Sequence, residues 1–147
     1  MLNTKEQKTM SIITDLMESP TSLATSSKFT ILNGIIYIAA GSLLLLWPGA
    51  VQTLFLDAEF VGREAALVRI IGMTVAIIGW FYFFGGRTGG KQVVAASVLD
   101  RIILVPLVLI PTAIAGVFPH LMLTFAVLDP VLGIIAWILL ARESAGT

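Results

Sequence analysis

Residues 93 to 118, VVAASVLDRIILVPLVLIPTAIAGVF, form a long apolar run that contains one aspartate and one arginine, Asp100 and Arg101. At about 1.5 Å per residue, a helix of about 20 residues crosses the roughly 30 Å hydrocarbon core of a bilayer. We therefore interpret this stretch as a transmembrane helix that keeps two charged side chains inside the membrane.

The sequence contains three further apolar segments of similar length. The four predicted spans are residues 29–47, roughly 64–85, roughly 93–117 and roughly 121–141. A helix is the only open-chain structure that crosses a bilayer, because each backbone polar group must find its partner within the segment. The predicted fold is an all-α membrane protein. A four-helix transmembrane bundle is expected over 29–142, with a polar segment over 1–28 and a short tail over 143–147.

The composition excludes several classes of function. Only 12% of the 147 residues are charged, whereas soluble domains typically carry about 25%. Nine basic residues balance nine acidic ones, which argues against a nucleic-acid partner. The absence of cysteine and the single histidine, His120, leave no basis for an iron–sulfur cluster, a zinc–thiolate site or a bis-histidine haem. We expect no cofactor and no metal site, and no catalytic motif indicates an enzyme.

The segment before the first span is predicted to contain a short amphipathic helix at the membrane surface, which ends near residues 19–20. Its apolar residues at helical spacing are Met10, Ile13, Leu16 and Met17. The alternative is a loosely ordered tail. After the first span, residues 48–63 are expected to include a short half-buried helix, and GGRTGGK at 85–91 is expected to be a turn.

The cations lie mostly on one side of the predicted bundle. Only Arg63 lies in the loops of the opposite side, with Arg69 just inside the second span. Loops rich in Lys and Arg face the cytoplasm, so both termini are predicted to be cytoplasmic. The residues on the terminal side are Lys5, Lys8, Lys28, Arg87, Lys91 and Arg142.

Five ionisable residues lie in or at the edge of the predicted spans: Glu64, Arg69, Asp100, Arg101 and Asp129. A charge at the centre of a membrane helix costs at least about 2.5–3.5 kcal/mol. We expect these side chains to face a partner, the bundle interior or water. Arg69 and Asp129 are at comparable depth and are candidates for an ion pair. The formal charge of −1 leaves one carboxyl group that can gain or lose a proton. The alternative is that all five only hold helices together.

Prolines and glycines mark the spans as irregular and closely packed. Proline kinks a helix and frees carbonyl groups one turn back, and Pro106, Pro111 and Pro130 lie within the third and fourth spans. Small residues at regular spacing let helices approach closely. The candidate packing residues are Gly34 and Gly41, Gly72 and Gly79, and Gly133 one turn after Asp129. The aromatic run WFYFF at 80–84 is typical of an interfacial belt, with a quinone or retinoid pocket as the alternative.

The segment RIIGMTVAIIGWFYFFGGR, 69–87, resembles the second helix of small four-helix DoxX-like membrane proteins. In that family an arginine and a glycine open the helix, a glycine follows seven residues on, and an arginine closes it. The four-helix plan covers most of residues 29–142. Members include accessory subunits of membrane oxidoreductases and receptor-assembly factors. The resemblance implies an architecture and a tendency to partner, and it carries over no catalytic residue.

Two functional hypotheses follow from these features. The first is a membrane protein that passes ions or protons by way of the intramembrane carboxylates and arginines. Because four helices enclose little space, such a pore is expected to need several copies in a homo-oligomer. The second is a non-conducting accessory or assembly subunit of a larger membrane complex. In both hypotheses the lipid bilayer is the surrounding medium.

Overall fold

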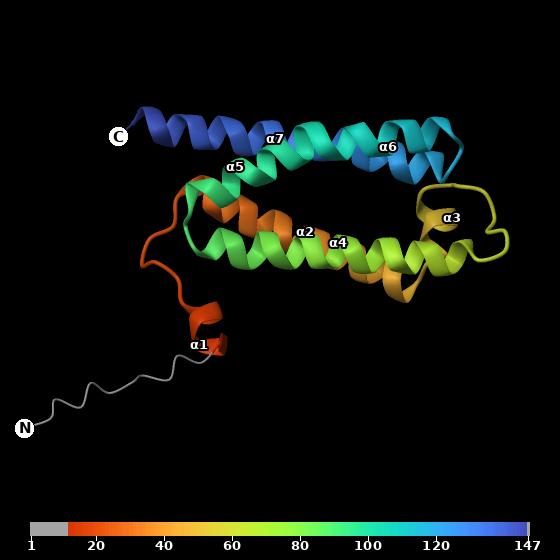
Figure 1. Cartoon of the computed structure of the whole chain (residues 1–147), viewed down its shortest axis with the longest axis horizontal. Helices are drawn as coiled ribbons and strands as arrows, with labels where there is room; N and C mark the ends of the chain where they lie inside the picture. The colour runs from red at the N-terminus through yellow and green to blue at the C-terminus, as the bar shows by residue number, and fades with distance from the viewer. Residues whose placement is uncertain (1–11, 147) are drawn as a thin grey trace, which may run out of the picture.

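A computed structural model describes residues 12–146, and all regular structure in this range is helical (Figure 1). The helices in chain order are α1 (Ile12–Met17), α2 (Thr25–Leu46), α3 (Ala50–Leu54), α4 (Glu64–Arg87), α5 (Lys91–Leu99), the π-helix η1 (Asp100–Leu104), α6 (Val105–Ile114) and α7 (Pro119–Ala145).

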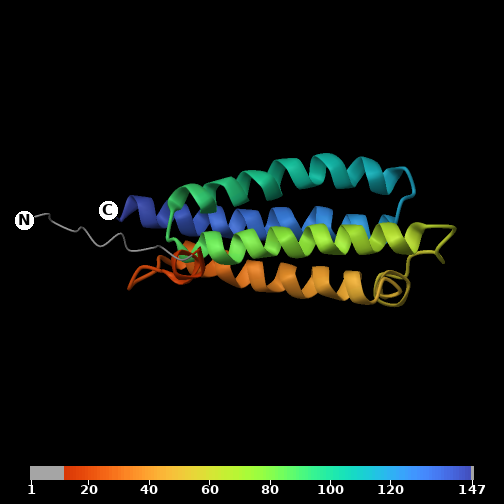
Figure 2. The same cartoon turned by 60° about the horizontal axis from the view of Figure 1, so that its bottom comes forward.

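Four helical segments are long and apolar enough to cross a membrane: α2, α4, the continuous α5–η1–α6 and α7. They lie side by side, with the start of α2 and the end of α7 at one end of the bundle and α3 at the other (Figure 2). We call these the terminal end and the α3 end. The predicted all-helical fold with four membrane-spanning helices is confirmed. The cytoplasmic orientation of the termini stays a prediction.

Helices α2 and α4 are in backbone contact along two pairs of glycines. A Cβ atom on Gly41 would lie 2.3 Å from the backbone N of Ala76 and 2.5 Å from the carbonyl O of Gly72. A Cβ atom on Gly34 would lie 2.7 Å from the carbonyl O of Gly79. None of these three distances leaves room for a methyl group, since carbon contacts are optimal at about 3.5–4.0 Å. The four predicted packing glycines of these helices therefore line one seam.

Helix α4, the second predicted span, extends further than the sequence pattern predicts. Gly85, Gly86 and Arg87 were expected in a turn, but they form the last turn of α4, and only residues 88–90 connect it to α5. Close packing explains the difference. A Cβ atom on Gly86 would lie 3.0 Å from the carbonyl O of Ser27. Glycine here permits a close approach to α2 rather than a change of chain direction.

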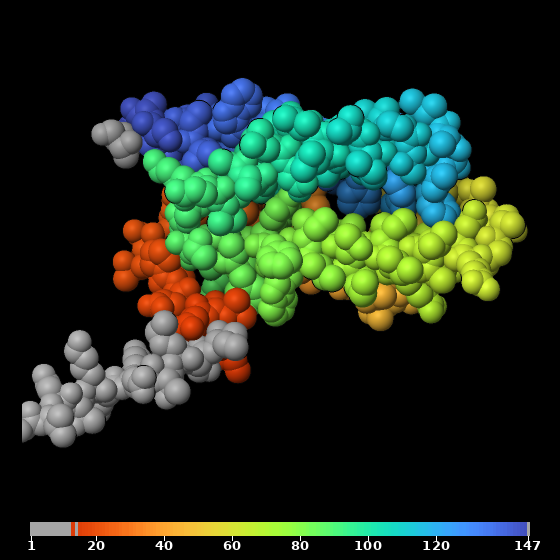
Figure 3. Space-filling model, viewed as in Figure 1, coloured from red at the N-terminus to blue at the C-terminus, as the bar shows by residue number. Residues whose placement is uncertain are grey.

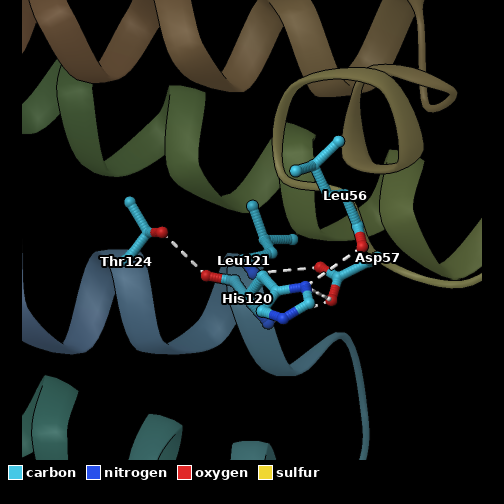
Figure 4. A network of polar contacts seen from close by, with 5 residues as sticks. All are labelled: Leu56, Asp57, His120, Leu121 and Thr124. Carbon is cyan, nitrogen blue, oxygen red and sulfur yellow. Dashed lines mark hydrogen bonds and ion pairs between the residues drawn. The ribbon is translucent and has the colours of Figure 1, made fainter.

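The α3 end is closed by an apolar core and by a polar clamp. The core includes Leu44, Val51, Val68, Phe118 and Leu121, and the predicted short helix of the first connection is α3. The clamp consists of Asp57 and the two residues that it contacts, His120 and Leu121 (Figure 4).

In the clamp, Asp57 is buried and accepts hydrogen bonds from the backbone N–H groups of His120 (2.9 Å) and Leu121 (2.9 Å). These two N–H groups belong to the first turn of α7, which has no partners for them within the helix. The His120 Nδ1 lies 3.2 Å from the same carboxylate. Asp57 thus caps α7 from a loop far away in sequence.

At the terminal end, α1 lies beside the bundle (Figure 1) and is joined to α4 by one hydrogen bond, in which Arg87 Nη2 donates to the Met17 carbonyl over 2.8 Å. Ile13 and Met17 are exposed on α1, and Met10 lies outside the described residues. The location of this helix at the membrane surface stays a prediction.

Candidate functional site

Two tyrosine–carboxylate pairs lie near the middle of the bundle. The Tyr37 hydroxyl of α2 donates a hydrogen bond to Asp129 Oδ1 of α7. The Tyr82 hydroxyl of α4 donates to Asp100 Oδ2 of η1 over 2.6 Å. The two tyrosine rings are in edge contact, with centroids 5.5 Å apart. Each carboxylate is thus held by a neutral donor from another helix, and all four spans contribute to one cluster.

Arg101 is at the centre of this cluster and is only 1% exposed. Its Cζ lies 4.4 Å from the ring centroid of Tyr82 and 5.1 Å from that of Tyr37. A desolvated cation over an aromatic face gains about 2 kcal/mol or more, which offsets part of the cost of burial. None of its three guanidinium nitrogens has a hydrogen-bond partner among residues 12–146. Arg101 therefore supplies a buried positive charge with unused donors.

Local backbone features explain how Asp100 and Arg101 reach these positions. The third span changes from α to π geometry over Asp100–Leu104, and the Val105 N–H bonds back to the carbonyl of Asp100. A single π turn inserts an extra residue into a helix and often occurs at functional sites. Gly133 of α7 faces this turn, since a Cβ atom on it would lie 3.1 Å from the Cβ of Arg101. The absence of a side chain at Gly133 makes room for Arg101.

A row of buried polar side chains continues from the cluster to the terminal end along one face of α2. Its members are Ser26, Ser27, Thr30 and Asn33, each 1% exposed, followed by Tyr37. Eleven residues separate Ser26 from Tyr37, which is roughly 16 Å along the helix axis. Within the described part of the chain, neither polar atom of the Asn33 amide has a hydrogen-bond partner. We call these five residues the α2 polar row.

Glu143 closes the polar row at the terminal end. Its Oε2 accepts a hydrogen bond from the Ser26 hydroxyl at 2.6 Å, and its Oε1 accepts one from the Ser26 N–H at 2.8 Å. The carboxylate therefore caps the start of α2 and fixes the end of α7 against it. One face of the bundle thus carries polar groups from Glu143 to Asp129.

On the α3 side of the cluster, a cavity of about 490 Å³ extends between α4 and α6. In Figure 3 it appears as a hollow between these two helices, with α7 visible behind it. Asp100, Asp129 and Tyr37 lie at its polar end, and its remaining walls are mostly aliphatic. The cavity opens sideways, where a membrane protein meets lipid.

The structure brings together three of the five predicted ionisable residues. Asp100, Arg101 and Asp129 share one cluster, whereas Arg69 is exposed on α4 and forms no ion pair with Asp129. The Arg69–Asp129 pair is therefore absent from the described residues, and Tyr37 is the hydrogen-bond partner of the Asp129 carboxylate. Glu64 accepts a hydrogen bond from the Val61 N–H at 2.7 Å and belongs to the start of α4.

Sequence reasoning missed the partners of these charges. The sequence pattern places Tyr82 in an aromatic belt and indicates no role for Tyr37, although a hydroxyl group among apolar residues is a signal of a buried hydrogen bond. From Ser27 through Thr30 and Asn33 to Tyr37 the buried positions recur at intervals of three or four, which is the spacing of one helix face, and Ser26 lies directly before Ser27. That periodicity could have identified the α2 polar row.

Comparisons with known proteins return no matching family model, no matching curated protein and no matching solved structure. The resemblance to DoxX-like proteins accordingly stays a hypothesis. The four apolar helices and the charged cluster between them are the features of a small polytopic membrane protein.

Proposed function

We propose that this protein passes protons across the membrane, with Asp129 as the central proton-carrying group. The observation that carries the proposal is the position of Asp129. It is 3% exposed and lies where the α2 polar row meets the cavity. Intramembrane carboxyl groups placed between two polar or accessible regions are typical of proton relays.

The half of the route toward the terminal end follows the α2 polar row. Four hydroxyl groups and one amide follow one another along a helix face, and Asn33 and Arg101 present buried polar atoms without hydrogen-bond partners among residues 12–146. Such groups are the ones that buried water molecules satisfy, typically with two to four hydrogen bonds each. A line of hydroxyl groups and water can transfer protons from Glu143 to Tyr37 without a wide pore.

The other half of the route needs water in the cavity as the proton carrier, because the apolar core closes the α3 end along the bundle axis and the cavity opens toward lipid. Asp129 and Asp100 both line this cavity. With Arg101, the three residues carry a formal charge of −1, so that one carboxyl group is left to exchange a proton. Since the charged side chains face the interior of one bundle, this route needs no second copy. Homo-oligomerisation remains a separate proposal.

The test is proton flux into liposomes that contain the purified protein, driven by a potassium diffusion potential and read by an internal pH dye. We expect Asp129→Asn to abolish the flux, because asparagine keeps an acceptor for Tyr37 but cannot exchange a proton. Arg69→Gln is the matched control, because Arg69 is a membrane charge outside the cluster, and we expect it to retain flux.

Absence of flux from folded wild-type protein would refute the proposal, as would equal flux from wild type and Asp129→Asn. Co-purification with a larger membrane protein at fixed stoichiometry would then favour the accessory-subunit hypothesis.

A further inference from the structure

We infer that the cavity between α4 and α6 is a binding site for a lipophilic amine in its protonated form, whose ammonium group would lie at Asp129 and Asp100. The inference goes beyond proton passage and does not depend on it. It rests on the shape of the cavity, the hydrogen-bonding state of its polar end and its charge.

The size and walls of the cavity fit a small lipophilic molecule. Sites for small ligands typically measure about 300–1,000 Å³ and combine mostly apolar walls with a few placed polar groups. The volume of about 490 Å³ lies in this range. The walls come from α4, including Ile71 and Val75, and from α6, including Val108 and Leu109. The opening between these helices admits a molecule directly from the bilayer.

The polar end offers hydrogen-bond acceptors and lacks free donors. Tyr37 and Tyr82 each use their hydroxyl hydrogen on a carboxylate, through Asp129 Oδ1 and Asp100 Oδ2. The second oxygen of each carboxylate has no hydrogen-bond partner among residues 12–146. The two threonines of the lining, Thr74 and Thr112, donate to carbonyl groups of their own helices. A complementary ligand must therefore donate hydrogen bonds.

The negative charge of the cluster favours a cationic ligand over a neutral hydrogen-bond donor. The two carboxylates of the lining share one compensating cation, Arg101, whose guanidinium lies over the tyrosine rings and is not part of the cavity wall. The cluster carries a formal charge of −1, which an ammonium group neutralises in a medium of low dielectric constant. An alcohol satisfies only the hydrogen bonds, and a carboxylate adds repulsion.

The test measures saturable binding of radiolabelled dodecylamine to the protein in phosphatidylcholine nanodiscs, with empty nanodiscs as background. Dodecanol and dodecanoate have the same chain length and serve as competitors. We expect saturable binding, strong competition by unlabelled dodecylamine, weak competition by dodecanol and none by dodecanoate. The same experiment with phosphatidylethanolamine in the nanodiscs shows whether a lipid ammonium group competes, which would make a lipid the source of the same chemistry.

Two variants separate the polar end from the cavity walls. Asp129→Asn should weaken binding by on the order of ten- to a hundredfold, because a charged hydrogen bond is lost. Val108→Trp should weaken it by filling the cavity from α6. Leu107→Trp is the matched control. Leu107 is 67% exposed against 61% for Val108, yet it does not line the cavity.

Absence of saturable binding would overturn the inference, as would equal affinity in wild type and Val108→Trp or stronger competition by dodecanoate. Binding is measured at equilibrium without a proton gradient. A protein that binds the amine without passing protons, or that passes protons without binding the amine, therefore separates the two proposals.

Discussion

The glycine seam between α2 and α4 gives the sharpest prediction about stability. In Gly41→Ala, the new methyl carbon would lie 2.3 Å from the Ala76 backbone N and 2.5 Å from the Gly72 carbonyl O. Both atoms are backbone, so no side-chain rotation relieves the contact. Restoring ordinary van der Waals distances requires the two helices to separate by roughly 1 Å, and overpacking of this kind typically costs about 1–3 kcal/mol.

The assay is reversible unfolding of the purified protein in mixed micelles with increasing denaturing detergent. Ala39→Val is the matched control, because it also enlarges a side chain of α2 but on its exposed side. We expect a change within about 0.5 kcal/mol for this control. Gly72→Ala should resemble Gly41→Ala, since its Cβ would lie 2.7 Å from the Gly41 carbonyl O.

The double variant Gly41→Ala with Gly72→Ala should lose less stability than the sum of the single variants. Once the helices have separated to accept one methyl group, the second enters the same gap at reduced cost. A Gly41→Ala protein as stable as Ala39→Val would refute the close-packed seam. Strictly additive losses would refute the shared gap.

Three further predictions concern the polar contacts. Asp57→Ala should lower the free energy of unfolding by about 1–2 kcal/mol, because it removes the cap of α7. His120→Ala should lower the free energy of unfolding by less than about 1 kcal/mol, since that side chain is 60% exposed. Unfolding in denaturing detergent compares the two variants, and equal losses of stability would contradict the role of Asp57 in the clamp. Tyr37→Phe should keep the ring contact with Arg101 but remove the hydrogen-bond donor to Asp129. We therefore expect it to change proton flux more than Phe125→Leu, a substitution in the cavity wall. Equal flux in the two variants would show that Tyr37 is not part of the route. Glu143→Gln should retain the fold and increase hydrogen exchange in the first turn of α2, because a neutral acceptor holds Ser26 more weakly; unchanged exchange would show that the cap contributes nothing there.

Composition and periodicity predicted the spans well, because membrane burial imposes length and hydropathy on each segment separately. The glycines of the seam were also predictable from the sequence, because a spacing of seven residues between glycines occurs in both helices. The ends of α4 were harder to place. Gly85 and Gly86 resemble a turn in sequence, but both continue the helix, where Gly86 packs against α2 and Gly85 against Val93 of α5.

The candidate site was predictable as a set of charges but not as a set of contacts. Asp100, Arg101 and Asp129 are conspicuous in apolar segments, yet their partners depend on how four helices rotate against one another. The π turn at Asp100–Leu104 also changes the direction in which the following side chains point around the helix axis, and a regular α-helical projection does not include this change. For this reason the sequence alone indicates neither the contact of Tyr37 with Asp129 nor the exposed position of Arg69.

The most direct test of the proton route is the Asn33→Leu variant, measured for flux and for stability together. Asn33 is 1% exposed, and its amide atoms have no hydrogen-bond partner in the range that the structure describes, so replacement by a similar-sized apolar residue should leave stability unchanged or raise it. The account predicts that flux falls at least about tenfold in a protein that unfolds at the same or a higher detergent concentration. Undiminished flux in this variant would show that protons do not travel along the α2 polar row.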